Sequence, residues 1–217
     1  MVFDSFYPGP NLEIYQSLRT NVQKLLWIAG TKGSGKTHLL QAAFHRCIRL
    51  SRKSLYIPMC EFDQFSPEIL DDLDQLDLIC IDDIEFILGN QAWERKLLDL
   101  YERLQTTDCH LVITSHAPPK GINFFLPDLA SRFSMSVVHQ LEMLTETEMI
   151  SAIQLHANIR GFNLPNDSAN YLLKRVERNV GSLMEIIKIL DYESLSKQRK
   201  LTVPFIKNIL HLGNKDQ

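Results

Sequence analysis

The sequence lacks an apolar run long enough to cross a bilayer. Its longest apolar runs, such as residues 25–30 and 78–81, have the length of buried strands, whereas a membrane helix needs about 18 or more apolar residues in succession. The amino terminus also lacks the basic stretch and apolar stretch of a secretory signal. We therefore expect a cytoplasmic protein without membrane association.

Cysteine, glycine and proline are scarce as well. The chain has nine glycines and nine prolines in 217 residues, which excludes a collagenous or low-complexity chain, and its 45% hydrophobic content argues against global disorder. The cysteines are widely spaced and form no Cys-x-x-Cys pair, so the sequence favours free thiols over a metal site or a disulfide framework. They are Cys47, Cys60, Cys80 and Cys109.

Basic residues are missing from a long stretch in the middle of the chain. Residues 54–94 contain eleven acidic side chains and no lysine or arginine, whereas residues 1–53 carry a net charge of +6, eight basic minus two acidic. Lysine and arginine are the residues that bind nucleic-acid phosphates. We therefore interpret the stretch as a solvated acidic face that does not bind DNA.

What the sequence does contain is an alternation of strand-like and helix-like segments. Apolar runs separated by amphipathic segments predict βα units on a parallel sheet. The expected strands are residues 25–29, 55–58, 78–81, 111–114 and 136–140, with helices that include residues 38–50 and 92–104. No strand-like run follows residue 143. The prediction is a three-layer α/β core over residues 1–143 and an all-helical domain over residues 144–217.

Helix signals fill the second region. Thr145 and Glu148 form a capping box that opens a helix to Arg160, and Gly161 suits the position just past its end. Further helices are expected at residues 167–177, 182–197 and 203–211.

The most specific motif follows the first expected strand. Residues 30–37 match the phosphate-binding pattern Gly-x-x-x-x-Gly-Lys-[Ser/Thr] between a strand and a helix. Glycines let backbone N–H groups surround phosphate oxygens, and the helix N-terminus adds partial positive charge. We expect ADP or ATP with Mg²⁺ here, rather than a glycine-rich turn without a ligand. The expected nucleotide-binding residues are Gly30, Thr31, Lys32, Gly33, Ser34, Gly35, Lys36, Thr37 and His38.

Within this site, three residues are given chemical roles. Lys36 is expected to reach the β- and γ-phosphates, and the Thr37 hydroxyl to bind Mg²⁺. Asp82 follows the expected strand 78–81 and would orient Mg²⁺ through water. The neighbouring Asp83 would polarise the attacking water.

Other polar residues near the expected strand ends receive weaker assignments. Thr114 and Ser115 end the strand at 111–114, where they either sense the γ-phosphate or cap the strand turn. His116 is not assigned a catalytic role. Glu85 and Glu94 are expected to be surface residues.

The order of these elements resembles that of a known family. The phosphate loop, the acidic strand and the polar strand end, followed by Leu-Pro-Asp-Leu-Ala-Ser-Arg-Phe at residues 126–133 and a helical lid, resemble the AAA+ ATPase module of the DnaA clade, a P-loop NTPase fold. Residues 3–11, 160–165 and 198–207 are similar to the matching stretches of Hda-type DnaA-related regulators. The resemblance covers nearly the whole chain.

The resemblance implies a function and partners. Such a regulator carries ADP, works with the DNA-loaded sliding clamp and stimulates hydrolysis of the ATP bound to DnaA, which suppresses re-initiation of DNA replication. These regulators lack the helix-turn-helix domain of DnaA, and we expect the same here. Strong direct binding to DNA is therefore not expected, and a homo-oligomer stays open.

The resemblance gives Arg132 a catalytic role in trans. In AAA+ assemblies an arginine of one subunit lies beside the γ-phosphate bound by its neighbour, and such arginines contribute about 10³–10⁵ in rate. The planar, permanently charged guanidinium suits this task. On the local pattern, a surface or helix-capping arginine is the alternative.

The chain departs from the family pattern twice. A clamp-binding peptide of Gln-x-x-Leu type is expected ahead of Phe3, yet two residues precede it here, so either the chain is truncated or the clamp is contacted otherwise. The lid arginine that approaches the nucleotide aligns with Gly181, so the chain's own ATP hydrolysis is expected to be weak. Arg178 either replaces it or belongs to a solvated face.

Two other functions stay open. An autonomous AAA+ ATPase of helicase-loader type would turn over ATP with its own Lys36, Asp82 and Asp83. A nucleotide-stabilised adaptor would bind DnaA or another AAA+ partner without a trans-acting arginine.

Overall fold

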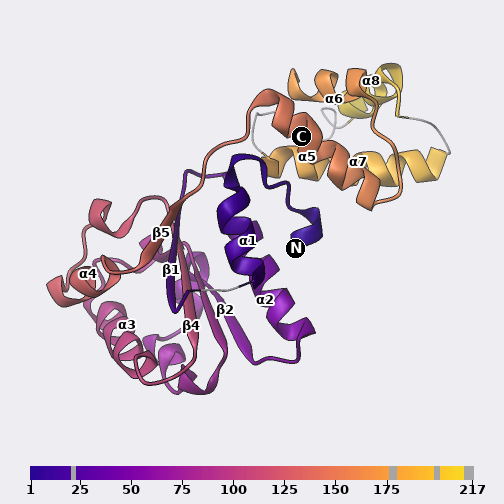
Figure 1. Ribbon diagram of the computed structural model, residues 1–217. Helices are drawn as coiled ribbons and strands as arrows, with labels where there is room; N and C mark the ends of the chain where they lie inside the picture. Colours follow the sequence, from indigo (N-terminus) through magenta and orange to yellow (C-terminus); the bar gives the residue numbers. More distant parts are fainter. Residues whose placement is uncertain (21–22, 176–179, 198–200, 213–217) are drawn as a thin grey trace. The chain divides into compact units, whose positions relative to one another are not determined.

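The computed structural model describes residues 1–20, 23–175, 180–197 and 201–212 (Figure 1). The chain divides into two compact units. Residues 1–3 and 10–142 form one, called here the α/β unit, and residues 4–9 and 143–217 form the other, the helical unit.

A five-stranded parallel sheet forms the centre of the α/β unit, with the strand order β2-β3-β4-β1-β5. Every strand end lies within one residue of its expected position. The strands are β1 (Leu25–Ala29), β2 (Ser54–Pro58), β3 (Leu78–Asp82), β4 (His110–Ser115) and β5 (Val137–Gln140). Because β1 pairs with both β4 and β5, the phosphate loop follows an interior strand of the sheet.

Helices cover both faces of this sheet, which gives the expected three layers (Figure 1). The helices α1 (Leu12–Thr20) and α2 (Lys36–Arg49) lie on one side, and α3 (Gln91–Leu104) and α4 (Pro127–Phe133) on the other. Trp27 and Phe133 meet in the core on the α3 side, with ring centroids 5.6 Å apart. The helix α1 is not among the helices expected from the sequence.

The acidic stretch between β2 and β3 folds into short 3-10 helices. They are η3 (Met59–Gln64), η4 (Pro67–Leu70) and η5 (Leu73–Gln75). Met59 and Leu70 are buried in the core, whereas Asp63 and Glu68 are exposed. Apolar residues thus anchor the stretch while much of its charge faces solvent, as expected of an acidic face.

The helical unit consists of α5 (Glu146–Ile159), α6 (Asn166–Leu173), α7 (Val180–Lys197) and α8 (Val203–Leu212). The capping box of Thr145 and Glu148 is present, and Gly161 has φ 86°. α6 ends at Leu173, earlier than expected; residues 176 and 177 lie outside the described part of the chain.

Residues 4–9 belong to the helical unit although more than 130 residues separate them from the rest of it in the sequence. Phe6 is buried, and the His156 ring of α5 hydrogen-bonds the backbone of Ser5. No helix in the described ranges is both long and apolar enough to span a membrane.

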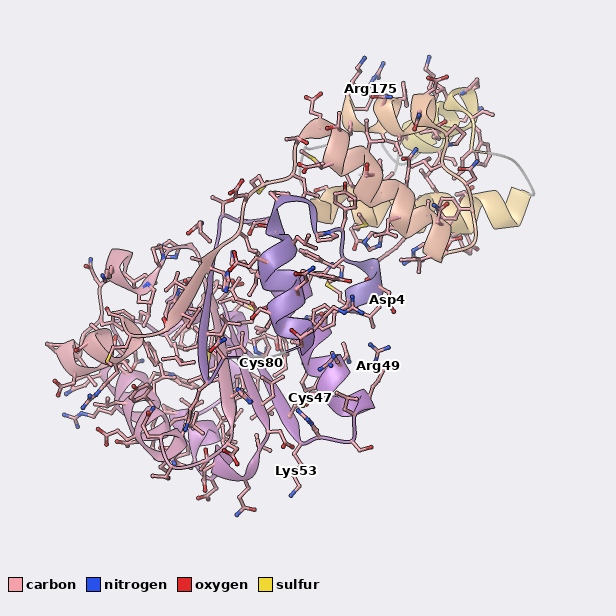
Figure 2. All side chains as sticks on the ribbon, viewed as in Figure 1. Asp4, Cys47, Arg49, Lys53, Cys80 and Arg175 are labelled. Carbon is pink, nitrogen blue, oxygen red and sulfur yellow. The ribbon has the colours of Figure 1, made fainter. Side chains whose placement is uncertain are left out.

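The four cysteines are free thiols. Cys47, Cys80 and Cys109 are buried, while Cys60 is exposed. Figure 2 shows Cys80 inside the α/β unit, and Arg49 and Lys53 pointing outward near the C-terminal end of α2. Burial raises the pKa of the Cys80 thiol well above its usual value, which keeps this thiol protonated.

Candidate phosphate-binding site

The loop between β1 and α2 is shaped by its glycines. A Cβ atom on Gly30 would lie 2.6 Å from the Ser34 Oγ, so a larger residue there would force the Ser34 side chain to move. Gly35 takes φ 99° as the N-cap of α2, a conformation that L-residues with side chains avoid. The N-terminus of α2, with its unpaired N–H groups, therefore directly follows a tight loop, as an anion site requires.

A cavity of about 460 Å³ opens beside this loop. The loop side is lined by Lys32, Gly33, Gly35, Lys36 and Thr37, and the opposite side by Asp83, Glu85, Phe86 and His116. The fold thus brings together basic loop residues and an acidic residue more than forty positions away in the sequence.

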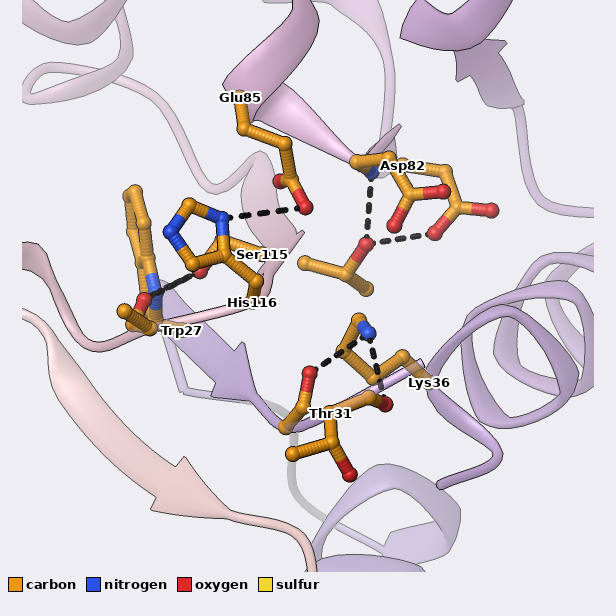
Figure 3. A network of polar contacts seen from close by, with 11 residues as sticks. Trp27, Thr31, Lys36, Asp82, Glu85, Ser115 and His116 are labelled. Carbon is orange, nitrogen blue, oxygen red and sulfur yellow. Dashed lines mark hydrogen bonds and ion pairs between the residues drawn. The ribbon is translucent and has the colours of Figure 1, made fainter. Parts of the chain in front are cut away.

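Lys36 is 7% exposed and is held by the loop itself. Its Nζ donates to the Gly30 carbonyl at 2.7 Å and to the Thr31 carbonyl at 3.2 Å (Figure 3). An ammonium group has three donors. Two of them close the loop in this arrangement, and the third remains for a ligand.

Asp82 is not among the described residues that line the cavity, and two side chains fix its carboxylate; Figure 3 shows one of these two hydrogen bonds. Asp82 is 3% exposed, and its Oδ1 accepts from the Thr114 hydroxyl at 2.5 Å while its Oδ2 accepts from the Tyr56 hydroxyl at 2.7 Å. The Thr114 Oγ1 also accepts from the backbone N–H of Asp83 at 2.8 Å. Burial and the bond to Asp82 raise the pKa of Tyr56, so this phenol stays a donor. Tyr56 was not among the expected site residues.

Asp83 lines the cavity and has φ 53°, a left-handed conformation for a residue with a side chain. Burial raises the pKa of its carboxyl group, the neighbouring charges of Asp82 and Glu85 raise it further, and Lys36 opposes them. A carboxylate with a raised pKa is a stronger proton acceptor. This environment suits the role expected for Asp83.

Glu85 is less exposed than the sequence analysis expected. Its side chain is 25% exposed and lines the cavity, with its Oε1 3.3 Å from the Nδ1 of His116.

Ser115 accepts a hydrogen bond from Trp27 Nε1 at 2.7 Å and donates to the Ala117 carbonyl. These bonds tie the end of β4 to β1 and to the following turn.

The expectation that Glu94 lies on the surface is wrong. Glu94 is fully buried, and its carboxylate accepts from three backbone N–H groups: Gly89 at 2.7 Å, Phe125 at 2.9 Å and Leu126 at 2.7 Å. In the sequence it is an ordinary acidic residue in the first turn of a helix. Two of its three donors lie about thirty residues further along the chain, so no local sequence pattern indicates them.

Other expected residues are not among the described residues that line the cavity. His38 places its Nε2 3.2 Å from the Val2 carbonyl oxygen. Arg132 is exposed on α4 and is not among the described residues that line the cavity. Gly181 belongs to the first turn of α7 in the helical unit, and Arg178 lies outside the described residues.

Two family models match the chain. The model of the bacterial DnaA ATPase domain matches residues 2–140, and the model of the Hda lid domain matches residues 146–210. Their boundary falls close to the change from sheet to helices.

Solved structures share the fold. Domain III of the Thermotoga maritima replication initiation protein DnaA has a TM-score of 0.81 at 23% identity, covering 97% of this chain and 95% of that chain. AMPPCP-bound DnaA from Aquifex aeolicus has a TM-score of 0.75 at 22% identity, covering 88% and 65%. The Thermotoga maritima RuvB Holliday junction branch migration motor has a TM-score of 0.68 at 18% identity, covering 93% and 66%. The fold is that of an α/β P-loop NTPase of AAA+ type.

Proposed function

Because this chain belongs to the DnaA-related AAA+ proteins, with a bacterial DnaA-type ATPase domain and an Hda-type lid, we propose that it is a nucleotide-binding negative regulator of replication initiation. In this proposal it stimulates hydrolysis of the ATP bound to DnaA, with the DNA-loaded sliding clamp as a second partner. It acts in the cytoplasm and does not itself bind DNA strongly.

The observation that carries this proposal is the placement of Arg132. The helix α4 is anchored by Leu129 and Phe133, both fully buried, while Arg132 of the same helix is exposed. Arg132 is also outside the described lining of the chain's own phosphate cavity. An exposed guanidinium on a well-anchored helix can be presented to a phosphate bound by another protein at a small entropic cost.

The chain's own cavity fits the phosphates of ADP or ATP together with Mg²⁺. Two of the three N–H donors of the Lys36 ammonium bind the loop, which leaves the third for a phosphate oxygen. The buried Ser34 Oγ has no hydrogen-bond partner among the described residues. Lys32, Lys36 and the N-terminus of α2 would bind phosphate oxygens, and the Thr37 hydroxyl and Asp82 would hold Mg²⁺, Asp82 through water. Bound Mg²⁺ would neutralise charge on the phosphates.

Asp83 favours a second candidate function, that of an autonomous ATPase. Its carboxylate lines the cavity opposite Lys36 and would accept a proton from an attacking water. Gly181, at the position of the lid arginine in the family pattern, argues for weak turnover. We therefore propose that bound nucleotide here mainly maintains the active conformation, while Arg132 serves DnaA.

The decisive experiment measures hydrolysis of DnaA-bound ATP in the presence of clamp-loaded DNA. The parent chain is expected to accelerate it, and Arg132→Ala to remove the acceleration, since such arginines contribute about 10³–10⁵ in rate. Arg132→Lys should rescue poorly because an ammonium lacks the planar donor fork. Nucleotide affinity should stay unchanged in both variants.

Arg95→Ala is the matched control. Arg95 is an exposed arginine of α3, so this variant removes the same charge from the same unit, and we expect full stimulation. If Arg132→Ala stimulates DnaA like the parent, the trans-acting arginine is excluded and the adaptor function replaces it. ATP turnover by the chain alone at the stimulated rate would instead favour the autonomous ATPase.

A further inference from the structure

Glu94 connects two loops that lead to different functional groups. Its Oε1 accepts from Gly89 and from Phe125, and its Oε2 accepts from Leu126. Gly89 ends the segment that begins at Asp83, on the wall of the phosphate cavity. Leu126 is the N-cap of α4, the helix that carries Arg132.

The segment from Asp83 to Gly89 can transmit a displacement. Its backbone forms consecutive turns, with hydrogen bonds from Phe86 to Asp83 and from Ile87 to Ile84. Ile84 and Ile87 are fully buried, so two side chains of the segment are anchored in the core. Gly89 itself, in contrast, has φ 82° and nothing within 4 Å of a Cβ placed on it. The end of the segment is held by the bond from Gly89 to Glu94 and by the backbone bond from Asn90 to Ile87.

The same carboxylate also binds the backbone of the segment before α4, whose Phe124 and Leu126 side chains pack on the core. Phe125 is 53% exposed, so its side chain does not anchor the backbone. Leu126 caps α4 without a side-chain hydrogen bond to that helix. The N–H groups of these two residues are fixed by Glu94, whose charge is buried and compensated by backbone donors.

From this geometry we propose that Glu94 is a positioning residue that couples the phosphate cavity to Arg132. A shift of Asp83 when Mg²⁺ and nucleotide bind moves Gly89. The shared Glu94 carboxylate passes the movement to the start of α4, and α4 reorients Arg132. Occupancy of the chain's own site thereby regulates the arginine it presents. The effect on DnaA rests on the proposed function, whereas the coupling within the chain does not.

Hydrogen exchange of the full chain tests the coupling without DnaA. In the parent, saturating Mg–ADP is expected to change exchange both in residues 83–90 and in residues 122–133. In Glu94→Gln the carboxamide NH₂ meets a backbone donor where the carboxylate accepted a bond. The response should then remain in residues 83–90 and disappear in residues 122–133.

Asn90→Ala is the matched control for a general loss of stability. The Asn90 side chain caps the same helix by accepting from the N–H groups of Ala92 and Trp93, but it has no hydrogen bond to the segment before α4. This variant should keep both responses. A response of residues 122–133 that persists in Glu94→Gln, or that is absent from the parent, would overturn the coupling.

The DnaA assay gives the second readout. Glu94→Gln is expected to lower the maximal stimulated rate of ATP hydrolysis by about tenfold or more, because a small misplacement of a catalytic group has that effect, and to change the half-saturating concentration of the chain by less than about twofold. Asn90→Ala should match the parent in both quantities. A parent chain that leaves DnaA unstimulated contradicts the proposed function, while the exchange result still decides the coupling. A parent that stimulates together with an equally active Glu94→Gln contradicts the coupling.

Discussion

The two units of this protein differ in what lies inside them. The α/β unit buries several polar or charged residues, and the site residues are among them: Asn11, Ser34, Lys36, Asp82, Glu94, Thr114 and Ser115. Among the described buried residues of the helical unit, Ser168 is the corresponding polar one. The α/β unit therefore combines an apolar core with buried hydrogen bonds, whereas the described interior of the helical unit is mainly apolar, as at Ile153, Leu172 and Leu190.

The most severe test of this contrast is Glu94→Leu. The change leaves three partly buried N–H groups without their acceptor, which should destabilise the α/β unit by about 4 kcal/mol. Chemical denaturation followed by Trp27 and Trp93 fluorescence measures the loss, since both tryptophans lie in this unit. A loss of less than about 1 kcal/mol, no more than a lost helix cap, would mean that polar satisfaction does not dominate there.

In the helical unit the corresponding change is Leu190→Ala. Leu190 is fully buried in α7, so the cavity left behind should cost about 3 kcal/mol. Native-state hydrogen exchange locates this effect in the helical unit. Ile189→Ala, at an exposed neighbouring position, should cost less than about 0.5 kcal/mol. Equal effects of the two substitutions would contradict the packing of α7 described here.

A third prediction concerns the contribution of Lys36, a buried charged residue of the α/β unit, to the binding of ADP. Removing a charged phosphate donor should weaken binding of ADP by about 2 kcal/mol, or roughly 30-fold, as measured by calorimetry. Lys32→Ala removes an exposed lysine from the same cavity wall and should have a smaller effect. Unchanged affinity in Lys36→Ala would remove the assignment of this cavity to nucleotide.

A smaller effect is expected for Ser168→Ala in the helical unit. The Ser168 hydroxyl donates to the buried Leu201 carbonyl at 2.7 Å, and losing one such bond should cost about 1 kcal/mol by denaturation. Ser151→Ala, whose bond to the Thr147 carbonyl is exposed, is the control and should be nearly neutral. A cost as large as that of Glu94→Leu would erase the difference between the two interiors.

The smallest effect concerns pH. Burial lowers the pKa of His156 below its ordinary value of 6.5, with Arg160 adding to the shift, so the folded helical unit favours the neutral ring. As pH falls through 6.5, the unfolded chain takes up a proton before the folded one does. Stability is therefore full above this range and declines below it. Hydrogen exchange of α5 at several pH values should show the decline, and His156→Gln should flatten it. An equally steep decline in His156→Gln would assign it to another group.

The strands, the loop at residues 30–37 and the capping box could be predicted because each depends on residues that are close together in the sequence. The alternation of apolar runs predicted all five strands, and the pattern at residues 30–37 predicted the loop between β1 and α2. The position of Glu94 could not be predicted in this way. Its acceptor role depends on donors about five and thirty residues away, which the folded backbone alone brings together.

Long-range contacts also explain why two other features could not be predicted from the sequence. Tyr56 sits in an ordinary strand, and its hydroxyl meets Asp82 because β2 and β3 are neighbours in the sheet. Residues 4–9 lie between two parts of the α/β unit in sequence yet pack with the helical unit. In both cases the deciding contact is long-range, and no local propensity encodes it.

The strand order has a consequence for the order in which the chain is synthesised. β1 emerges from the ribosome first, but its two neighbours in the sheet, β4 and β5, begin at His110 and Val137. Until those residues exist, both edges of β1 present unpaired backbone groups beside an apolar sequence, a state that invites aggregation. Assembly of the sheet must therefore wait for distant segments, which makes it slow for a chain of this size. A chain released by premature termination before residue 110 keeps its phosphate-loop sequence but has no neighbours for the strand that carries it.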